Sequence, residues 1–229
     1  MAVDRKRNVE YRRFKLGRYL GPACRLCRTE GMKLYLKGDR CNSRQCAIER
    51  GKGQPGKNSR DRVKKLSDYG LQLRAKQRVK RTYGMFEKQF RGFFSNATRQ
   101  QGVTGDNLIK ILETRLDNIV YRMHFAASRN QARQLVSHGH ILVNGKRVSI
   151  PSYLVRANDS IEVHESSKRM TVIKDSLKEY SRSGVVPWLE VDPDALVGAV
   201  KAIPERSDVQ DLRELVGISE QLIVELYSK

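Results

Sequence analysis

The stretch from Arg115 to Val163, RLDNIVYRMHFAASRNQARQLVSHGHILVNGKRVSIPSYLVRANDSIEV, is the one segment whose local signals agree from end to end. Apolar residues recur at three- and four-residue spacing from Leu108 to Met123, which predicts one helix across that range. A second helix is predicted to begin at Ser128, because Ser128 and Gln131 fit the capping box, and to end at Gly139.

The pattern then changes from a helical period to the alternation that is typical of strands. Two short runs, 140–143 and 146–148, flank Asn144-Gly145, the strongest short-range signal for a β-hairpin. A further strand is predicted at 161–163, after the Asn158-Asp159 turn. The segment is therefore predicted to form two helices packed on a small antiparallel sheet.

Cationic side chains are spread over this unit, from its second helix to its hairpin. They are Arg129, Arg133, His138, His140, Lys146 and Arg147. A single arginine pair on a helix is usually no more than a solvated face. A series of cations that crosses a helix, its C-terminal turn and a hairpin instead favours RNA binding.

The charge of the chain is strongly positive and unevenly distributed. The 229 residues carry a formal net charge of +20, and the whole excess lies in residues 1–100, because residues 101–229 hold equal numbers of acidic and basic side chains. A half-chain of one sign repels itself, so a polyanionic partner is expected. An anionic membrane surface is the alternative, but no long basic amphipathic helix with a Trp- and Phe-rich face supports it. Neither a secretory signal nor an apolar run of membrane-spanning length is found.

The four cysteines form two pairs, Cys24-x-x-Cys27 and Cys41-x-x-x-x-Cys46, with thirteen residues between the pairs. Two thiolate pairs joined by a short loop can close one tetrahedral metal site, and such clustering in an intracellular-looking chain favours a metal over disulfides. The prediction is one structural zinc ion, with an iron–sulfur cluster at the same four cysteines as the alternative. Nothing in the pattern indicates an open catalytic position.

A strongly basic helix is predicted from about residue 67 to about residue 83. Its apolar seam consists of Leu71, Ala75 and Val79. The stripe beside the seam consists of Arg74, Arg78 and Arg81. Because the sequence gives this stripe almost no acidic partners, phosphate is expected to offset its repulsion. Tyr69 and Tyr83, next to the stripe, are the candidates for stacking on bases.

Four segments carry a resemblance to a known family. RLDN…SRNQARQLVSHGHILVNGKRV resembles the RNA-binding αL domain that many RNA-handling proteins share. RYLGPACRLCRTEGMKLYLKGDRC (18–41), SDYGLQLRAKQRVKRTYGMFEKQF (67–90) and EQLIVELYSK (220–229) occur with it in the order seen in the family of bacterial small-subunit ribosomal protein four. The resemblance covers about residues 17–229.

The resemblance implies a primary binder of small-subunit rRNA, which contacts a multi-helix junction and nucleates assembly of the subunit body. It also implies neighbouring small-subunit proteins near the mRNA entry channel, mRNA as a further partner, a role in translational accuracy, and a cytoplasmic location in the ribosome. Recognition is expected to rest on backbone contacts, RNA shape and 2′-hydroxyls. The residues predicted to contact RNA are Arg18, Arg74, Arg78, Arg81, Arg129, Arg133, His138, Lys146 and Arg147.

The predicted fold class is α+β and mainly helical, with the small αL-type domain inserted into the helical part. Five parts are predicted: a basic extension (1–17), the four-cysteine metal knuckle (18–50), a basic helical domain (51–106), the αL RNA-binding domain (107–165) and a C-terminal segment (166–229). A final helix is favoured at about residues 219–227. The resemblance implies that the C-terminal segment packs back on the helical domain.

No pattern in the chain supports catalysis, and no small-molecule substrate is expected. The four histidines have no companion nucleophile motif, and no Walker loop or nucleophile elbow is found. The alternatives are a translational repressor and the RNA-binding module of an rRNA- or tRNA-modifying enzyme, which would need a further catalytic domain. A zinc-knuckle DNA regulator is disfavoured, because no recognition helix follows the cysteines at finger spacing.

Overall fold

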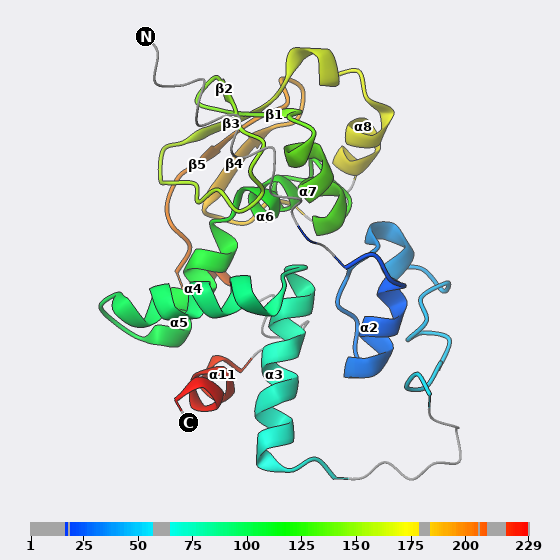
Figure 1. Ribbon diagram of the computed structural model, residues 1–229. Coiled ribbons are helices and arrows are strands. Elements are labelled where there is room, and N and C mark those ends of the chain that lie inside the picture. Colours follow the sequence, from blue (N-terminus) through cyan, green and yellow to red (C-terminus); the bar gives the residue numbers. More distant parts are fainter. Residues whose placement is uncertain are drawn as a thin grey trace.

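The computed structural model describes residues 17, 19–56, 65–178, 184–205, 207–209 and 219–228. Within them the chain forms a helical lobe and a mixed lobe, which occupy the lower and upper halves of Figure 1. The helical lobe consists of α2 (Ala23–Glu30), η1 (Gly38–Cys41), α3 (Asp68–Thr82), α4 (Glu87–Arg99), α5 (Thr104–Glu113), η3 (Ser207–Val209) and α11 (Glu220–Tyr227). The mixed lobe consists of α6 (Leu116–Arg122), α7 (Arg129–Ser137), β1 (Ile141–Val143), β2 (Lys146–Arg147), β3 (Ser160–Val163), η2 (Glu165–Ser167), α8 (Thr171–Leu177), β4 (Leu189–Asp192) and β5 (Val197–Val200).

The two lobes are connected at residues 114 and 115, where the helix that the apolar spacing predicts is interrupted. α5 ends at Glu113 and α6 begins at Leu116, so the prediction of a continuous helix from Leu108 to Met123 is wrong. The backbone of Arg115 is extended, with φ −68° and ψ 137°, and forms a bridge with Leu154. The apolar spacing continues on both sides of the break, which explains why the pattern conceals it.

The cap of α7 and the hairpin follow their sequence signals. The Ser128 side chain accepts a hydrogen bond from the backbone N–H of Gln131 at 3.4 Å. Asn144 and Gly145 both have positive φ, 50° and 72°, as a two-residue type I′ turn requires. The turn joins β1 and β2 as an antiparallel pair, so both predictions are confirmed.

The sheet has five antiparallel strands in the order β2-β1-β3-β5-β4. β5 lies beside β3, with Gly198 opposite Ile161, so strands from beyond residue 165 complete the sheet of the αL unit. The predicted boundary at 165 therefore does not separate two bodies in space. The last helix forms as predicted, and α11 packs against α3 and α5 of the helical lobe.

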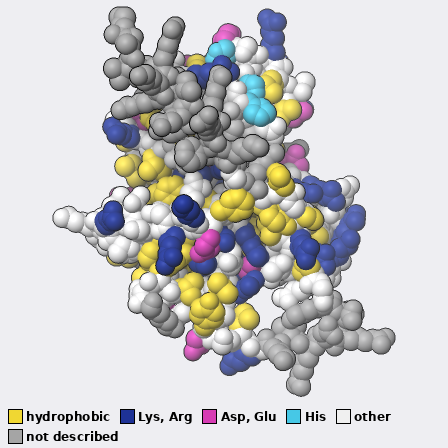
Figure 2. Space-filling view, viewed as in Figure 1, with side chains coloured by type: hydrophobic (Ala, Val, Ile, Leu, Met, Phe, Trp, Pro, Cys, Tyr) yellow, Lys and Arg dark blue, Asp and Glu magenta, His cyan; other side chains and the backbone are white. Residues whose placement is uncertain are grey.

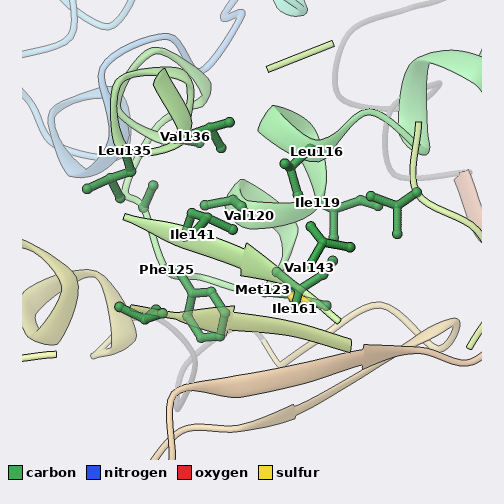
Figure 3. Close-up of a cluster of buried hydrophobic side chains, with 14 of the residues drawn as sticks. Leu116, Ile119, Val120, Met123, Phe125, Leu135, Val136, Ile141, Val143 and Ile161 are labelled. Atoms are coloured by element: carbon green, nitrogen blue, oxygen red, sulfur yellow. The ribbon is translucent and has the colours of Figure 1, made fainter. Parts of the chain in front are cut away.

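Each lobe has its own hydrophobic core. In the mixed lobe α6 and α7 pack on one face of the sheet, and Figure 3 shows Ile119 and Val136 directed towards Ile141 and Ile161. In the helical lobe Phe90 is fully buried among side chains of α3, α5 and α11. No described helix is long and apolar enough to cross a bilayer. Burial of this apolar surface is the main favourable term that holds each lobe together.

Candidate nucleic-acid interface

The predicted arginine stripe lies along α3 beside α2, and its three guanidinium groups converge on Glu30. The Glu30 side chain is fully buried, while the arginine side chains keep 30%, 27% and 21% of their surface exposed. Arg74 Nη1 lies 3.3 Å from Glu30 Oε1 and Arg78 Nε lies 3.8 Å from Glu30 Oε2, and Arg81 donates a hydrogen bond to Glu30 Oε1. The stripe is therefore held against α2 by one buried carboxylate.

Positive charge remains in excess on α3. Burial raises the pKa of Glu30, and the three arginines oppose that rise without cancelling it. Lys76 and Lys80 share a second carboxylate, that of Glu87, at 2.6 and 2.8 Å. Five cations of the helix thus meet two carboxylates within the described part of the chain. The sequence argument overlooked Glu30 as a partner, because it lies 44 positions before Arg74.

Arg129 and Arg133 do not stand on an open face of α7, which corrects the sequence-based expectation. They are only 9% and 7% exposed and lie where the two lobes meet. Arg129 Nε donates to Asn118 Oδ1 at 2.8 Å, and its guanidinium lies over two tyrosine rings, with 4.5 Å to the nearer centroid. Arg133 Nη1 donates to Asp117 Oδ2 at 3.4 Å. These contacts fix the position of α7, and RNA contact by either arginine stays a prediction.

The two tyrosines proposed for base stacking differ in exposure. Tyr69, in the first turn of α3, is 58% exposed and open to a base. Tyr83 is 4% exposed and donates its hydroxyl proton to Glu113 Oε1 at 2.5 Å, so in this structure no base can reach its ring. Burial, followed by the charge of Glu113, raises the pKa of Tyr83 far above its ordinary value. Tyr83 is part of the lobe interface.

His138, Lys146 and Arg147 lie on the surface of the mixed lobe, as predicted. Arg147 Nε donates to the Gly139 carbonyl at 2.5 Å and Nη2 donates to the His138 carbonyl at 3.4 Å. Arg147 thus closes the hairpin over the C-terminal end of α7, where carbonyl dipoles attract a cation. Lys146 has no salt-bridge partner among the described residues. Figure 2 shows Lys and Arg side chains over both lobes on the viewed face, with few Asp or Glu side chains between them.

The four cysteines lie on one small knuckle and are free thiols. Cys24 and Cys27 are on α2, Cys41 ends η1, and Cys46 follows in the next turn; all except Cys24 are buried. The backbone N–H of Lys37 is directed at Cys41 Sγ, 3.4 Å away.

Burial and the closeness of the thiols to one another shift the pKa values of two cysteines in the knuckle. Burial raises the pKa of Cys27 and of Cys41, and the neighbouring thiols act in the same direction against opposing backbone N–H groups. Four cysteine sulfurs are a soft donor set, which fits zinc or an iron–sulfur cluster once the thiols are deprotonated. Among the described residues, however, no three His, Cys, Asp or Glu side chains are arranged closely enough to hold a metal ion as they stand.

Comparison with known proteins assigns both lobes. Residues 18–113 match the family described as ribosomal protein S4/S9 N-terminal domain, and residues 114–161 match the S4 domain. The small ribosomal subunit protein uS4 of Citrifermentans bemidjiense is 53% identical over 214 residues, covering 93% of this chain and all of that protein. The proteins of the same name from Geobacter sp. and Thermodesulfovibrio yellowstonii are 52% and 53% identical over the same coverage. The chain belongs to the uS4 family.

The uS4 family match and the structure divide the chain at the same place. The N-terminal match ends at residue 113 and the S4-domain match begins at residue 114, where α5 gives way to α6. The S4-domain match ends at residue 161, before the strands β4 and β5 that complete its sheet. Of the predicted RNA contacts in this uS4-family chain, Arg18 lies outside the described residues, as does the basic extension up to residue 16.

Proposed function

We propose that this uS4-family chain is a structural, non-enzymatic constituent of the small ribosomal subunit that binds its rRNA. The main support for the proposal is the charge of α3: within the described part of the chain, five of its cationic side chains share only two carboxylates, those of Glu30 and Glu87. Such an excess on one helix is stabilised by the phosphates of a polyanion. Family membership supports a place in the cytoplasmic ribosome.

Two surfaces supply the contacts in this proposal. The first is the α3 stripe with Arg74, Arg78 and Arg81, to which the family resemblance adds Arg18. The second is the hairpin surface with His138, Lys146 and Arg147. Cationic side chains of this kind bind phosphates, so recognition rests on the shape of the RNA backbone and its 2′-hydroxyls rather than on base sequence.

The finer role rests on the family resemblance. In this proposal the chain binds an rRNA junction early, nucleates assembly of the subunit body, and lies with neighbouring ribosomal proteins near the mRNA entry channel, where it contacts mRNA and contributes to accuracy. The chain spans the whole length of its uS4-named relatives. The alternative of a modifying enzyme with a separate catalytic domain therefore gains no support from them.

The test is a salt titration of binding to the 5′ domain of small-subunit rRNA with excess tRNA as competitor. Wild type is expected to bind in the presence of tRNA with a steep log–log salt slope. The double variant Arg74→Gln/Arg78→Gln should bind more weakly, with the slope reduced by about 1 to 2. Arg99→Gln, an exposed arginine in the last turn of α4, is the matched control and should leave both unchanged. Binding that tRNA abolishes, or a double variant equal to the control, contradicts the proposal.

We also propose that Cys24, Cys27, Cys41 and Cys46 hold one structural zinc ion, with an iron–sulfur cluster as the alternative. The paired spacing, the burial of three thiols and the N–H group directed at Cys41 Sγ support it. The ion would fold the knuckle and bring α2 into place against α3.

Elemental analysis of chain purified without chelator should find about one zinc per chain, or several irons with labile sulfide. The chain has no cysteines beyond these four, so a thiol reagent reports on the knuckle alone. The thiols should be protected until a chelator is added. Four reactive thiols and no metal in the purified chain would exclude the site.

A further inference from the structure

Three of the four histidines gather at one edge of the mixed lobe. His138 follows the last turn of α7, His140 precedes β1, and His164 follows β3. The rings of His138 and His140 have centroids 6.0 Å apart. The backbone N–H of His164 donates to the His140 carbonyl at 2.8 Å, which places these two residues side by side at the ends of the adjacent strands β1 and β3. Figure 2 shows histidine side chains beside Lys and Arg side chains on the upper part of the viewed face.

The hydrogen bonds of this cluster leave one nitrogen of each strand histidine available. His140 Nδ1 lies 2.8 Å from Ser167 Oγ, and His164 Nδ1 lies 2.8 Å from Ser166 Oγ. Both serines belong to η2, which therefore fixes the two rings. In the described part of the chain Nε2 of His140 has no hydrogen-bond partner, so it can donate to an anion once the ring is protonated.

The charges around the cluster favour an anion in its centre. Burial lowers the pKa of His140, and His138, Arg147 and His164 each lower it further. The acidic groups nearby are Glu162, on the same face of β3 as His164, and Glu165, which pairs with Lys168 at 2.9 Å. Arg169 adds a further cation. The three imidazoles repel one another when charged, so the protein alone favours their neutral forms, and a negative group between them would favour the charged forms.

We propose that His138, His140 and His164, together with Arg147, form a proton-linked binding site for a phosphodiester group of RNA. The inference rests on the proposed function and adds His140 and His164 to its contacts. A bound phosphate favours the protonated imidazoles, so the complex takes up protons that the free protein does not hold. Affinity for RNA therefore rises as the pH falls from about 8 to about 6, across the window in which histidine titrates.

Two other roles for the cluster are less consistent with the geometry. A metal site needs three ligands on one point, and the described residues contain no such arrangement. A structural role accounts for the Nδ1 atoms of two rings: His140 Nδ1 pairs with Ser167 Oγ, and His164 Nδ1 pairs with Ser166 Oγ and accepts from the backbone N–H of Ser166 at 3.3 Å. It does not account for Nε2 of either ring, for which no partner is found in the described part of the chain.

The experiment measures the affinity of the full chain for the rRNA fragment between pH 8 and pH 6 at constant ionic strength. Wild type should gain about tenfold, the change expected when roughly one proton is taken up over one pH unit. The double variant His140→Asn/His164→Asn should lose most of that gain. His124→Asn is the matched control, because His124 lies on the turn after α6, contacts the Gly184 carbonyl at 2.8 Å, and has a positive φ that asparagine tolerates.

Proton NMR titration of the imidazole signals provides a second readout that does not depend on affinity. Addition of a short single-stranded RNA should raise the titration midpoints of the three cluster histidines and leave that of His124 in place. Tight binding with the same pH dependence in wild type and the double variant, or unmoved midpoints, overturns this site alone. Failure of wild type to bind the rRNA fragment at any pH overturns both the proposed function and this site.

Discussion

Glu113 is a fully buried carboxylate that gathers hydrogen-bond donors from both lobes. Besides Tyr83, it accepts hydrogen bonds from Asn118 Nδ2 at 2.9 Å and from Arg122 Nε at 3.0 Å. Burial alone would raise the pKa of Glu113, but Arg122 and Arg129 hold it below its ordinary value. Because the folded pKa lies below the unfolded one, this carboxylate contributes stability that is present above the unfolded value and is lost as the pH falls through the folded value.

The substitution Tyr83→Phe should lower the free energy of unfolding by about 2 kcal/mol, since it removes one hydrogen bond to a buried charge and keeps the ring. Urea unfolding at neutral pH measures the effect. The matched control is Tyr69→Phe, on the same helix and 58% exposed, which should change stability by less than about 0.5 kcal/mol. Equal stability of the two variants would show that the Tyr83–Glu113 hydrogen bond contributes nothing.

The burial of Arg129 and Arg133 shows what the sequence could not predict about single residues. Arg129 and Arg133 were predicted to be exposed, because an arginine pair one turn apart on a polar helix is normally solvated. Their burial depends on Asp117, Asn118 and Tyr121, which are on α6, and on the ring of Tyr83, which lies more than thirty residues earlier in the chain. No local sequence pattern encodes such partners. The two arginines could therefore be singled out from the sequence, but their contacts within the protein could not be predicted.

At the scale of elements, α11 is attached to the helical lobe by the buried Ile223, by a hydrogen bond from Gln72 to Glu225, and by the aromatic ring of Tyr227. The Tyr227 ring stacks on Phe94, with centroids 4.4 Å apart and planes at 27°, and its hydroxyl donates to Glu87 Oε1 at 3.0 Å. Burial would raise the pKa of Glu87, but hydrogen bonds from Lys76, Lys80 and Tyr227 lower it to about 2. Glu87 therefore stays ionised and holds α3, α4 and α11 together down to strongly acidic pH.

Tyr227→Ala should loosen the packing of α11 on α3 and α5, which Ile223 still anchors, and destabilise the protein by about 2 kcal/mol, less than for a fully buried ring. Hydrogen exchange should become faster in α3 and α5 and stay unchanged in β1 and β3, since α11 packs on the helical lobe. Tyr227→Phe is the conservative comparison, which keeps the stacking and loses only the hydrogen bond to Glu87. Exchange that accelerates equally in both lobes would contradict a local attachment.

Elements were predictable where their signals are local. The Ser128 cap, the Asn144-Gly145 hairpin and the last helix each depend on neighbouring residues, and the structure has all three. The place of β4 and β5 in the sheet was not predictable, because β5 pairs with a strand that lies more than thirty residues earlier. Similarly, Leu71 was expected in the core, but α11 covers a different side of α3 and leaves Leu71 46% exposed.

At the scale of the whole molecule, charge changes sign across the mixed lobe. The strand register aligns Arg147, Leu142, Glu162, Val197 and Asp192 in one row across the sheet. The row is thus basic at the β2 edge and acidic at the β4 edge. Phosphate is attracted to the β2 edge, near the end of α7, and repelled from the β4 edge. This polarity supports the proposal that RNA binds on the side of the mixed lobe that carries the hairpin and the histidines.

A buried ion pair at the start of α6 fixes the arginine side chain that contacts the helical lobe, so its loss should uncouple the two lobes. Arg115 is fully buried and makes two hydrogen bonds to Asp117, at 3.0 and 2.6 Å, while its guanidinium lies 5.4 Å from the ring centroid of Phe93 in the helical lobe. The substitution Asp117→Asn leaves this guanidinium without its charge partner and should cost about 3 kcal/mol or more.

The single tryptophan, Trp188, lies in the core of the mixed lobe, so its fluorescence reports on that lobe, whereas far-UV circular dichroism follows the helices of both. In wild type the two urea transitions should coincide, as expected for lobes that unfold together. In Asp117→Asn they should separate, because Arg115 no longer ties the mixed lobe to α4. Asp175→Asn, which breaks an exposed pair with Lys178 on α8, should leave the transitions coincident and at the wild-type midpoint. If Asp117→Asn also unfolds in one coincident transition, the Glu113 hydrogen bonds and the other contacts between the lobes are sufficient to couple them, and the ion pair contributes stability alone.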